Sequence, residues 1–129
     1  MYFKSAVRTL PMLFSALFLL SGAVFLFAGN GSAYGYGRGK YLFNYYNCID
    51  CHAVNGIGGT LGPSLSGYGS KNKGYAWTVT QIKNPKAHYQ AGAAVKINGK
   101  SYLAVMPSYG YIPAGDLKGL AEYLCSLKK

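Results

Sequence analysis

Apolar residues recur with helical spacing most clearly near the C-terminus. Pro113 stands just ahead of this segment, and Lys128 and Lys129 close it, where positive charge suits the negative pole of a helix dipole. Between them the i, i+3, i+4, i+7 pattern is carried by Leu117, Leu120, Ala121, Leu124 and Leu127. The pattern predicts an amphipathic helix with one buried face.

Two shorter segments also follow a helical pattern. Leu42, Phe43 and Tyr46 share one face of a helix expected from about Gly39 to Asn47. A second helix is expected over residues 75–83, because the proline of Asn84-Pro85 disfavours helical geometry in the residue before it.

The remaining segments lack apolar periodicity and are rich in glycine. We expect a Gly/Tyr linker over residues 33–39, a loop over 53–74, and another loop over 91–113 that contains a tight turn at Asn98-Gly99. No confident pair of strands is indicated. The expected fold is therefore a small all-α domain of three to four short helices and long loops.

The first 33 residues have the character of an export signal. Lys4 and Arg8 precede an uncharged run from Leu10 to Ala28, and the small residues Gly31-Ser32-Ala33 follow. The uncharged run is also about long enough to span a bilayer. We expect residues 1–33 to be a secretory signal peptide or an N-terminal membrane anchor, with cleavage favoured over retention. Either outcome places a domain of residues 34–129 in the periplasm or on the outer face of the cytoplasmic membrane.

The charge balance points to a particular kind of partner. The chain has 13 Lys and Arg but only three acidic residues, Asp50, Asp116 and Glu122. A basic exported protein is steered towards acidic docking surfaces or anionic membranes. Nucleic acid is a poor partner, because the lysines are scattered and the chain is exported. We expect a monomer that meets partner proteins with acidic docking surfaces, with membrane association through residues 10–28 as a further option.

The motif Cys48-Ile49-Asp50-Cys51-His52 carries the most specific chemistry. C-x-x-C-H is the attachment signature of a c-type haem, in which two thiols bond the haem vinyl groups and the histidine binds the iron. A redox dithiol or half a zinc site would use the same cysteines. The adjacent histidine strongly favours one covalently attached haem c.

The iron then needs a sixth ligand or an open position. Met106 is the only methionine after residue 33, and a thioether opposite histidine raises the reduction potential. The alternatives are a core methionine at this position and His88 as a rival ligand. We favour Met106, since His88 has the sequence context of a surface residue.

Two further residues have a structural and a functional interpretation. The carbonyl of Pro63 could accept a hydrogen bond from His52, or Gly62-Pro63 could simply form a turn. Cys125 has no intramolecular partner left and is expected to be a small buried residue inside the last helix rather than a reactive or dimer-forming thiol.

Together these motifs resemble class I, monohaem cytochrome c. The resemblance covers nearly all of residues 38–129 and includes Gly39-x-x-Leu42-Phe43, C-x-x-C-H, Gly62-Pro63-Ser64-Leu65, Trp77, Ile82-Lys83-Asn84-Pro85, Met106-Pro107 and Tyr123-Leu124. It implies a haem bound by Cys48 and Cys51, axial ligands His52 and Met106, and a first and last helix that cross near Gly39, Phe43 and Tyr123. It also implies that Pro63 supports His52 and that Trp77 lies near the haem propionates. The step from Phe43 to Cys48 is one residue longer than in many members.

The resulting expectation is an electron carrier rather than an enzyme. With both axial positions filled, the iron would exchange single electrons between redox partners and bind no substrate. The alternatives are a haem subunit of a membrane or periplasmic oxidoreductase complex and, less favoured, a ligand-binding or peroxidase-like haem protein.

Overall fold

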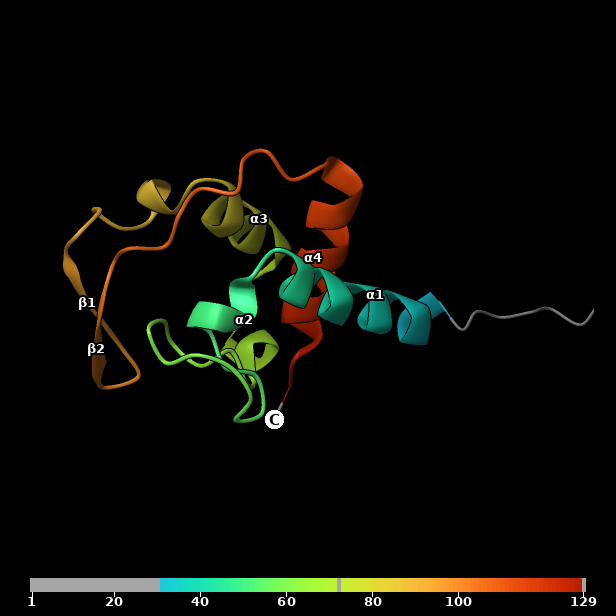
Figure 1. Ribbon diagram of the computed structural model, residues 1–129, viewed down its shortest axis with the longest axis horizontal. Helices are drawn as coiled ribbons and strands as arrows, with labels where there is room; N and C mark the ends of the chain where they lie inside the picture. The colour runs from blue at the N-terminus through green and yellow to red at the C-terminus, as the bar shows by residue number, and fades with distance from the viewer. Residues whose placement is uncertain (1–30, 72, 129) are drawn as a thin grey trace, which may run out of the picture.

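The computed structural model describes residues 31–71 and 73–128, which form four α-helices, two short 3-10 helices and one hairpin (Figure 1). The predicted leader over residues 1–33 lies almost entirely outside the described residues. Among the described residues, no helix has the length and apolarity needed to cross a bilayer. In chain order the elements are α1 (Gly31–Tyr45), α2 (Cys48–Cys51), η1 (Tyr68–Lys71), α3 (Tyr75–Lys83), η2 (Pro85–Ala87), β1 (Ala94–Ile97), β2 (Lys100–Leu103) and α4 (Ala114–Ser126).

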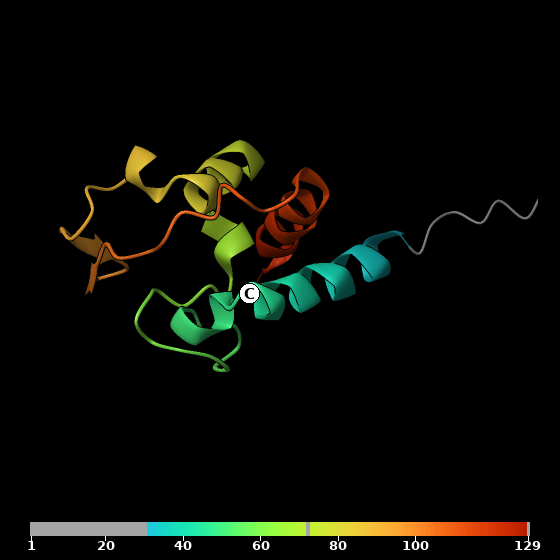
Figure 2. The same cartoon turned by 45° about the horizontal axis from the view of Figure 1, so that its top comes forward.

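The expected crossing of the first and last helices is present. Gly39 of α1 is buried where α4 passes it, and a Cβ at this position would lie 2.2 Å from Cβ of Tyr123. Only a residue without a side chain allows the two helices to approach this closely. The ring of Phe43 lies beside that of Tyr123, with centroids 6.0 Å apart. α3 packs on the other side of α4, so α4 is the central element of the fold (Figures 1 and 2).

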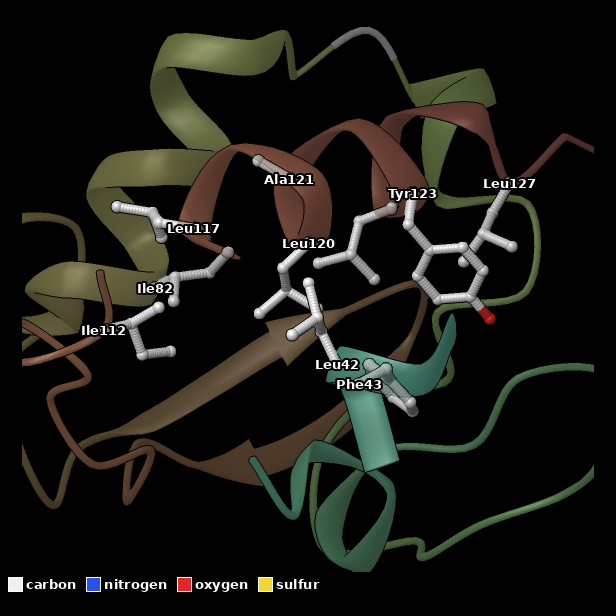
Figure 3. Packing of buried hydrophobic residues seen from close by; sticks show 10 residues of the cluster. Leu42, Phe43, Ile82, Ile112, Leu117, Leu120, Ala121, Tyr123 and Leu127 are labelled. Carbon is white, nitrogen blue, oxygen red and sulfur yellow. The ribbon is translucent and has the colours of Figure 1, made fainter. Parts of the chain in front are cut away.

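The apolar core is small and lies around α4. Leu120 and Ala121 are fully buried, and Leu42 and Phe43 of α1 lie below Leu120 in Figure 3. The other buried apolar residues of this cluster are Ile82, Ile112, Leu117, Tyr123, Leu124 and Leu127. The predicted apolar face of the last helix is thus confirmed as the face that builds the core.

Helix α1 begins earlier than the sequence pattern indicates. The structure continues the helix back to Gly31, where a Gly/Tyr linker over residues 33–39 was expected. Glycines are poor helix formers, so propensity alone argues against this extension. The contact of Tyr36 with Tyr123, edge to face with centroids 5.1 Å apart, gives the extra turns a tertiary partner. Packing on α4 therefore overrides the local preference.

The segment predicted as a loop over residues 91–113 contains an antiparallel hairpin. β1 and β2 pair from Ala94↔Leu103 to Ile97↔Lys100. Asn98 and Gly99, with φ of 50° and 81°, form the two-residue turn, and this turn geometry matches the twist of the flanking strands. The tight turn is confirmed, whereas the absence of strands was wrong, because four-residue strands leave little alternation to detect. The hairpin lies at the opposite end of the molecule from the start of α1 (Figures 1 and 2).

The other elements follow the prediction closely. α3 spans Tyr75–Lys83 as expected and ends at Asn84 ahead of the proline. The long loop after α2 is interrupted by the single 3-10 turn η1, which was not foreseen. The fold is a small helical domain with long loops and one hairpin, and these loops and the hairpin surround a cavity.

Candidate functional site

A cavity of about 200 Å³ lies between α2, α3, the loop after α2 and the hairpin. This is more than ten times the space that one buried water needs, so the cavity has room for a large ligand. Its walls are mainly apolar and include core residues from α1 and α4. The structure brings all six predicted site residues to this cavity: Cys48, Cys51, His52, Pro63, Trp77 and Met106.

The C-x-x-C-H segment forms one tight helical turn and the start of a loop. α2 holds Cys48 and Cys51 three positions apart, and the amide of His52 donates to the carbonyl of Cys48 at 3.0 Å. The following loop folds back onto this turn, since Gly59 donates to Ile49 O at 2.8 Å. A Cβ on Gly59 would lie 1.9 Å from the carbonyl oxygen of Asp50, so the close return requires glycine. The motif is thereby held as a rigid unit.

The His52 imidazole is held from two sides. Its Nδ1 lies 2.8 Å from the carbonyl oxygen of Pro63, so Nδ1–H donates and Nε2 is left with a free lone pair. Gly62 lies directly against the ring, because a Cβ there would be 2.4 Å from Cε1. Burial lowers the pKa of His52, although the bond to Pro63 acts in the opposite direction. A neutral imidazole with an exposed lone pair is what a metal ligand must be.

The cysteine chemistry does not fit a redox dithiol. Burial raises the pKa of the Cys48 thiol to about 11, whereas a reactive dithiol needs a lowered pKa that supplies thiolate. Among residues 31–71 and 73–128, no group of three or more His, Cys, Asp or Glu side chains could hold a metal ion. The motif therefore lacks the further protein ligands that a structural zinc site would require.

Met106 and His88 occupy different places. Met106 lines the cavity from the segment after β2, and its sulfur accepts a hydrogen bond from Nε2 of Gln81 at 3.4 Å. His88 stands outside the cavity wall, with Nδ1 2.9 Å from Oε1 of Gln81 and its ring stacked on Trp77. The thioether is the one of these two candidates that faces the cavity.

Several residues at the cavity were missed by sequence reasoning. Gln81 follows Trp77 by four residues on α3 and shares its face, a spacing that could have identified it. Val95 and Tyr102 reach the cavity from paired positions of the hairpin. Because the sequence analysis predicted no strands, it gave no reason to place these two residues together. Tyr109, just before α4, also lines the wall.

The donor set and the shape of the cavity fit a covalently bound haem. Two thiols on one turn, a free imidazole nitrogen beside them, and a thioether within the same apolar cavity are the groups such a cofactor uses. Cys125 takes no part in this, since it lies half-buried on α4 with its sulfur 3.5 Å from Oγ1 of Thr78.

Comparison with known proteins agrees with the assignment of the cavity to a haem. The sequence model of the family described as Cytochrome c matches residues 36–128, which is most of the chain. A curated relative, the cytochrome c oxidase subunit 2 of Alkalihalophilus pseudofirmus, is 30% identical over 91 residues. The match covers 70% of this chain but only 25% of the relative, so the chain spans about a quarter of that protein's length. No solved structure matches the chain significantly.

Proposed function

This chain belongs to the cytochrome c family, whose members carry covalently bound haem c, and we propose that it is an exported monohaem electron carrier. In this proposal Cys48 and Cys51 hold one haem, while His52 and Met106 bind its iron. The observation that carries the proposal is the oriented His52 imidazole in the same apolar cavity as the Met106 thioether.

The bound haem supplies an iron that alternates between the ferric and ferrous states. The protein's own residues set the conditions for that exchange. Pro63 fixes the His52 ring and enriches its electron density through the hydrogen bond to Nδ1. A thioether ligand favours the ferrous state, and the apolar walls disfavour the extra charge of the ferric state. Both effects raise the reduction potential without any catalytic residue.

Basic and apolar side chains near the cavity suit a redox partner with an acidic docking surface. Lys71 and Lys73 line the cavity, and exposed Lys96 and Lys100 lie on the hairpin beside it. Exposed lysines steer an acidic partner into an encounter complex. The apolar side chains that are exposed at the same cavity are Leu61, Leu103 and Val105, and they would complete the contact.

Export is supported by the sequence of the leader. Residues 1–33 follow the order of a secretory signal, and we propose that they direct residues 34–129 to the periplasm or the outer face of the membrane. C-type haem is attached on that side of the bacterial membrane, so export and cofactor belong together.

A visible spectrum with a redox titration tests the ligand set. The purified protein should show one covalent haem per chain and a single one-electron transition. Met106→Ala should lower the midpoint potential and open the iron to carbon monoxide, whereas His88→Phe should leave the sixth position closed. A wild-type protein that binds carbon monoxide rapidly when reduced would instead indicate a ligand-binding or peroxidase-like haem protein.

A second candidate is the haem subunit of a membrane or periplasmic oxidoreductase complex. The similarity to a cytochrome c oxidase subunit favours it, and so would retention of residues 10–28 as an anchor. Mass analysis of the mature N-terminus separates the two. A cleaved leader with the protein in the soluble periplasmic fraction supports the free carrier, and an intact leader in the membrane fraction supports the subunit.

A further inference from the structure

Five tyrosines form a continuous row from the cavity wall to the outer face of α1. Tyr109 lines the cavity, and its ring lies 6.0 Å from that of Tyr111, measured between centroids. The row continues from Tyr111 to Tyr46 at 6.4 Å, from Tyr46 to Tyr45 at 5.0 Å, and from Tyr45 to Tyr41 at 5.7 Å. We call these five residues the tyrosine patch. The patch joins α1 to the segment before α4, which is distant from it in the sequence.

The outer part of the tyrosine patch is open to solvent. Tyr41 and Tyr45 are each 61% exposed, and Tyr111 is 71% exposed. A contiguous group of exposed aromatic rings marks a site where another molecule makes contact. Aromatic residues are also enriched at the centre of protein–protein interfaces, where charged residues are depleted. The patch therefore has the composition of a docking surface.

The inner end of the tyrosine patch lies beside the haem attachment motif. Burial raises the pKa of Tyr109, and the neighbouring Cys48 and Tyr111 raise it further, which places the Tyr109 hydroxyl close to the attachment turn. Tyr109 also lines the cavity itself. A molecule that touches Tyr111 is thus separated from the cavity by a single ring.

The charges around the tyrosine patch cancel. Arg38 forms an ion pair with Asp116, and Asp116 also accepts a hydrogen bond from the Tyr46 hydroxyl at 2.9 Å. Lys40 and Asp50 add one exposed charge of each sign. Two of the three acidic residues of the chain thus border the patch, whereas the chain as a whole has a formal net charge of +10. Two copies of so basic a protein repel each other, and at this patch they can approach without local repulsion.

We propose that the tyrosine patch is a transient docking surface for a second copy of this chain, through which copies of the protein exchange electrons. This inference deepens the proposed function and rests on it, because the electron must come from a haem in the cavity. The reduced copy loses one electron and the oxidised copy gains it, so no bond forms or breaks and no further reactant is needed. The contact pairs the same patch of both copies across a two-fold axis.

The contact between two copies should be weak and short-lived. Electron-transfer encounters bury less surface than stable protein complexes, and the positive charge outside the patch opposes association. The protein should therefore elute as a monomer while its copies still exchange electrons. Lys96 and Lys100 lie on the hairpin, outside the patch, and stay available to an acidic partner.

Electron self-exchange tests the contact, measured from NMR line widths in mixtures of ferric and ferrous holoprotein. Tyr111→Lys places a positive charge from each copy within the contact. Tyr75→Lys is the matched control, because Tyr75 is another exposed tyrosine, lies outside the patch and gives the same total charge when replaced. At low salt we expect the rate of Tyr111→Lys to fall about three- to tenfold below that of Tyr75→Lys, since like charges a few ångströms apart repel by about this factor. The difference should shrink as added salt shortens the Debye length.

A second readout does not depend on electron transfer. Amide chemical shifts of the ferrous holoprotein should change with protein concentration at the patch residues in wild type and in Tyr75→Lys, but not in Tyr111→Lys. If Tyr111→Lys fails to fold or has an altered visible spectrum, Tyr45→Lys repeats both measurements at another exposed position of the patch.

Three results would overturn the proposal. Equal exchange rates in Tyr111→Lys and Tyr75→Lys would show that the patch is not the contact, and so would concentration-dependent shifts centred on the hairpin lysines. Binding of the wild type to neutral phosphatidylcholine vesicles, lost in Tyr111→Lys, would assign the patch to a bilayer. A chain with no covalent haem or no reversible one-electron transition would overturn the proposed function itself, whereas an intact redox titration with equal exchange rates overturns the contact alone.

Discussion

The crossing of α1 and α4 predicts that Gly39→Ala destabilises the domain strongly. The new Cβ would lie 2.2 Å from Cβ of Tyr123 and 2.7 Å from the carbonyl oxygen of Gly119. The atoms it meets are backbone or next to it, so no flexible side-chain end can rotate away. The helices must therefore move apart, and the contact of Phe43 with Tyr123 must loosen with them.

The size of the effect comes from two opposing contributions. Overpacking a well-packed contact costs about 1–3 kcal/mol. The cost here should lie at the upper end of that range, because the neighbouring atoms belong to the backbone or are attached to it and cannot rotate away. Alanine in place of glycine inside a helix returns up to about 1 kcal/mol. The expected net loss is about 2 kcal/mol, which corresponds to a fall of roughly 8 °C or more in Tm for a domain of this size.

Thermal unfolding of the holoprotein measures this loss, and Gly37→Ala is its control. Gly37 lies in the same helix, and a Cβ there would meet nothing within 4 Å. Gly37→Ala should therefore raise Tm slightly or leave it unchanged, because it gains helix propensity without a clash. If Gly39→Ala proved as stable as Gly37→Ala, the close crossing would not exist in solution and the reasoning would be refuted.

Three further predictions concern the haem ligand, the core and the alkaline limit. Gly62→Ala, whose Cβ would lie 2.4 Å from the His52 ring, should displace the imidazole and change the ferric visible spectrum; an unchanged spectrum would contradict the placement. Thr78→Val removes a buried hydroxyl that bonds both Gly74 O and a tyrosine hydroxyl, and should lower the free energy of unfolding by about 1–3 kcal/mol in a denaturant titration. The exposed Thr80→Val should stay within about 0.5 kcal/mol of wild type, and equal losses would argue against the buried network. Burial and the hydrogen bond to the Asp116 carboxylate raise the pKa of Tyr46 from 10.0 to about 12. The contribution of Tyr46 to folding stability is therefore complete below pH 10 and is lost as the pH rises to 12. Tyr46→Phe should flatten the fall in the free energy of unfolding between pH 10 and 12, and an unaltered slope would contradict the raised pKa.

The elements that sequence reasoning predicted well are those with a dense local signal. α4 has four apolar residues at helical spacing with Leu127 directly after its end, and α3 is ended by a proline. Spacing alone left Gly62-Pro63 as either a turn or a partner of His52, and the resemblance favoured the partner; the structure places His52 Nδ1 2.8 Å from the Pro63 carbonyl oxygen. In each case the structural feature depends on residues that lie close together in the sequence.

The features that were missed depend on contacts between distant segments. The turns of α1 before Gly39 exist because α4 lies beside them, and glycine-rich sequence alone predicts a linker there. The hairpin strands have four residues each, too few for alternation to stand out from a polar loop. Gln81 was not singled out and His88 was weighed only as a rival ligand, because their relation to Met106 appears only after three segments come together.

The core and the candidate haem site are parts of one apolar structure. Phe43, Ile82, Leu120 and Leu124 belong to the buried cluster and also line the cavity. Each of these side chains packs against α4 or its neighbours on one side and faces the cavity on the other. A haem in the cavity would remove the remaining apolar surface from water and so contribute to folding as well as to redox chemistry. The core of so short a domain is small, and its geometry allows the cofactor to complete it. A haem held by the attachment motif would therefore serve stability and electron transfer through the same apolar contacts.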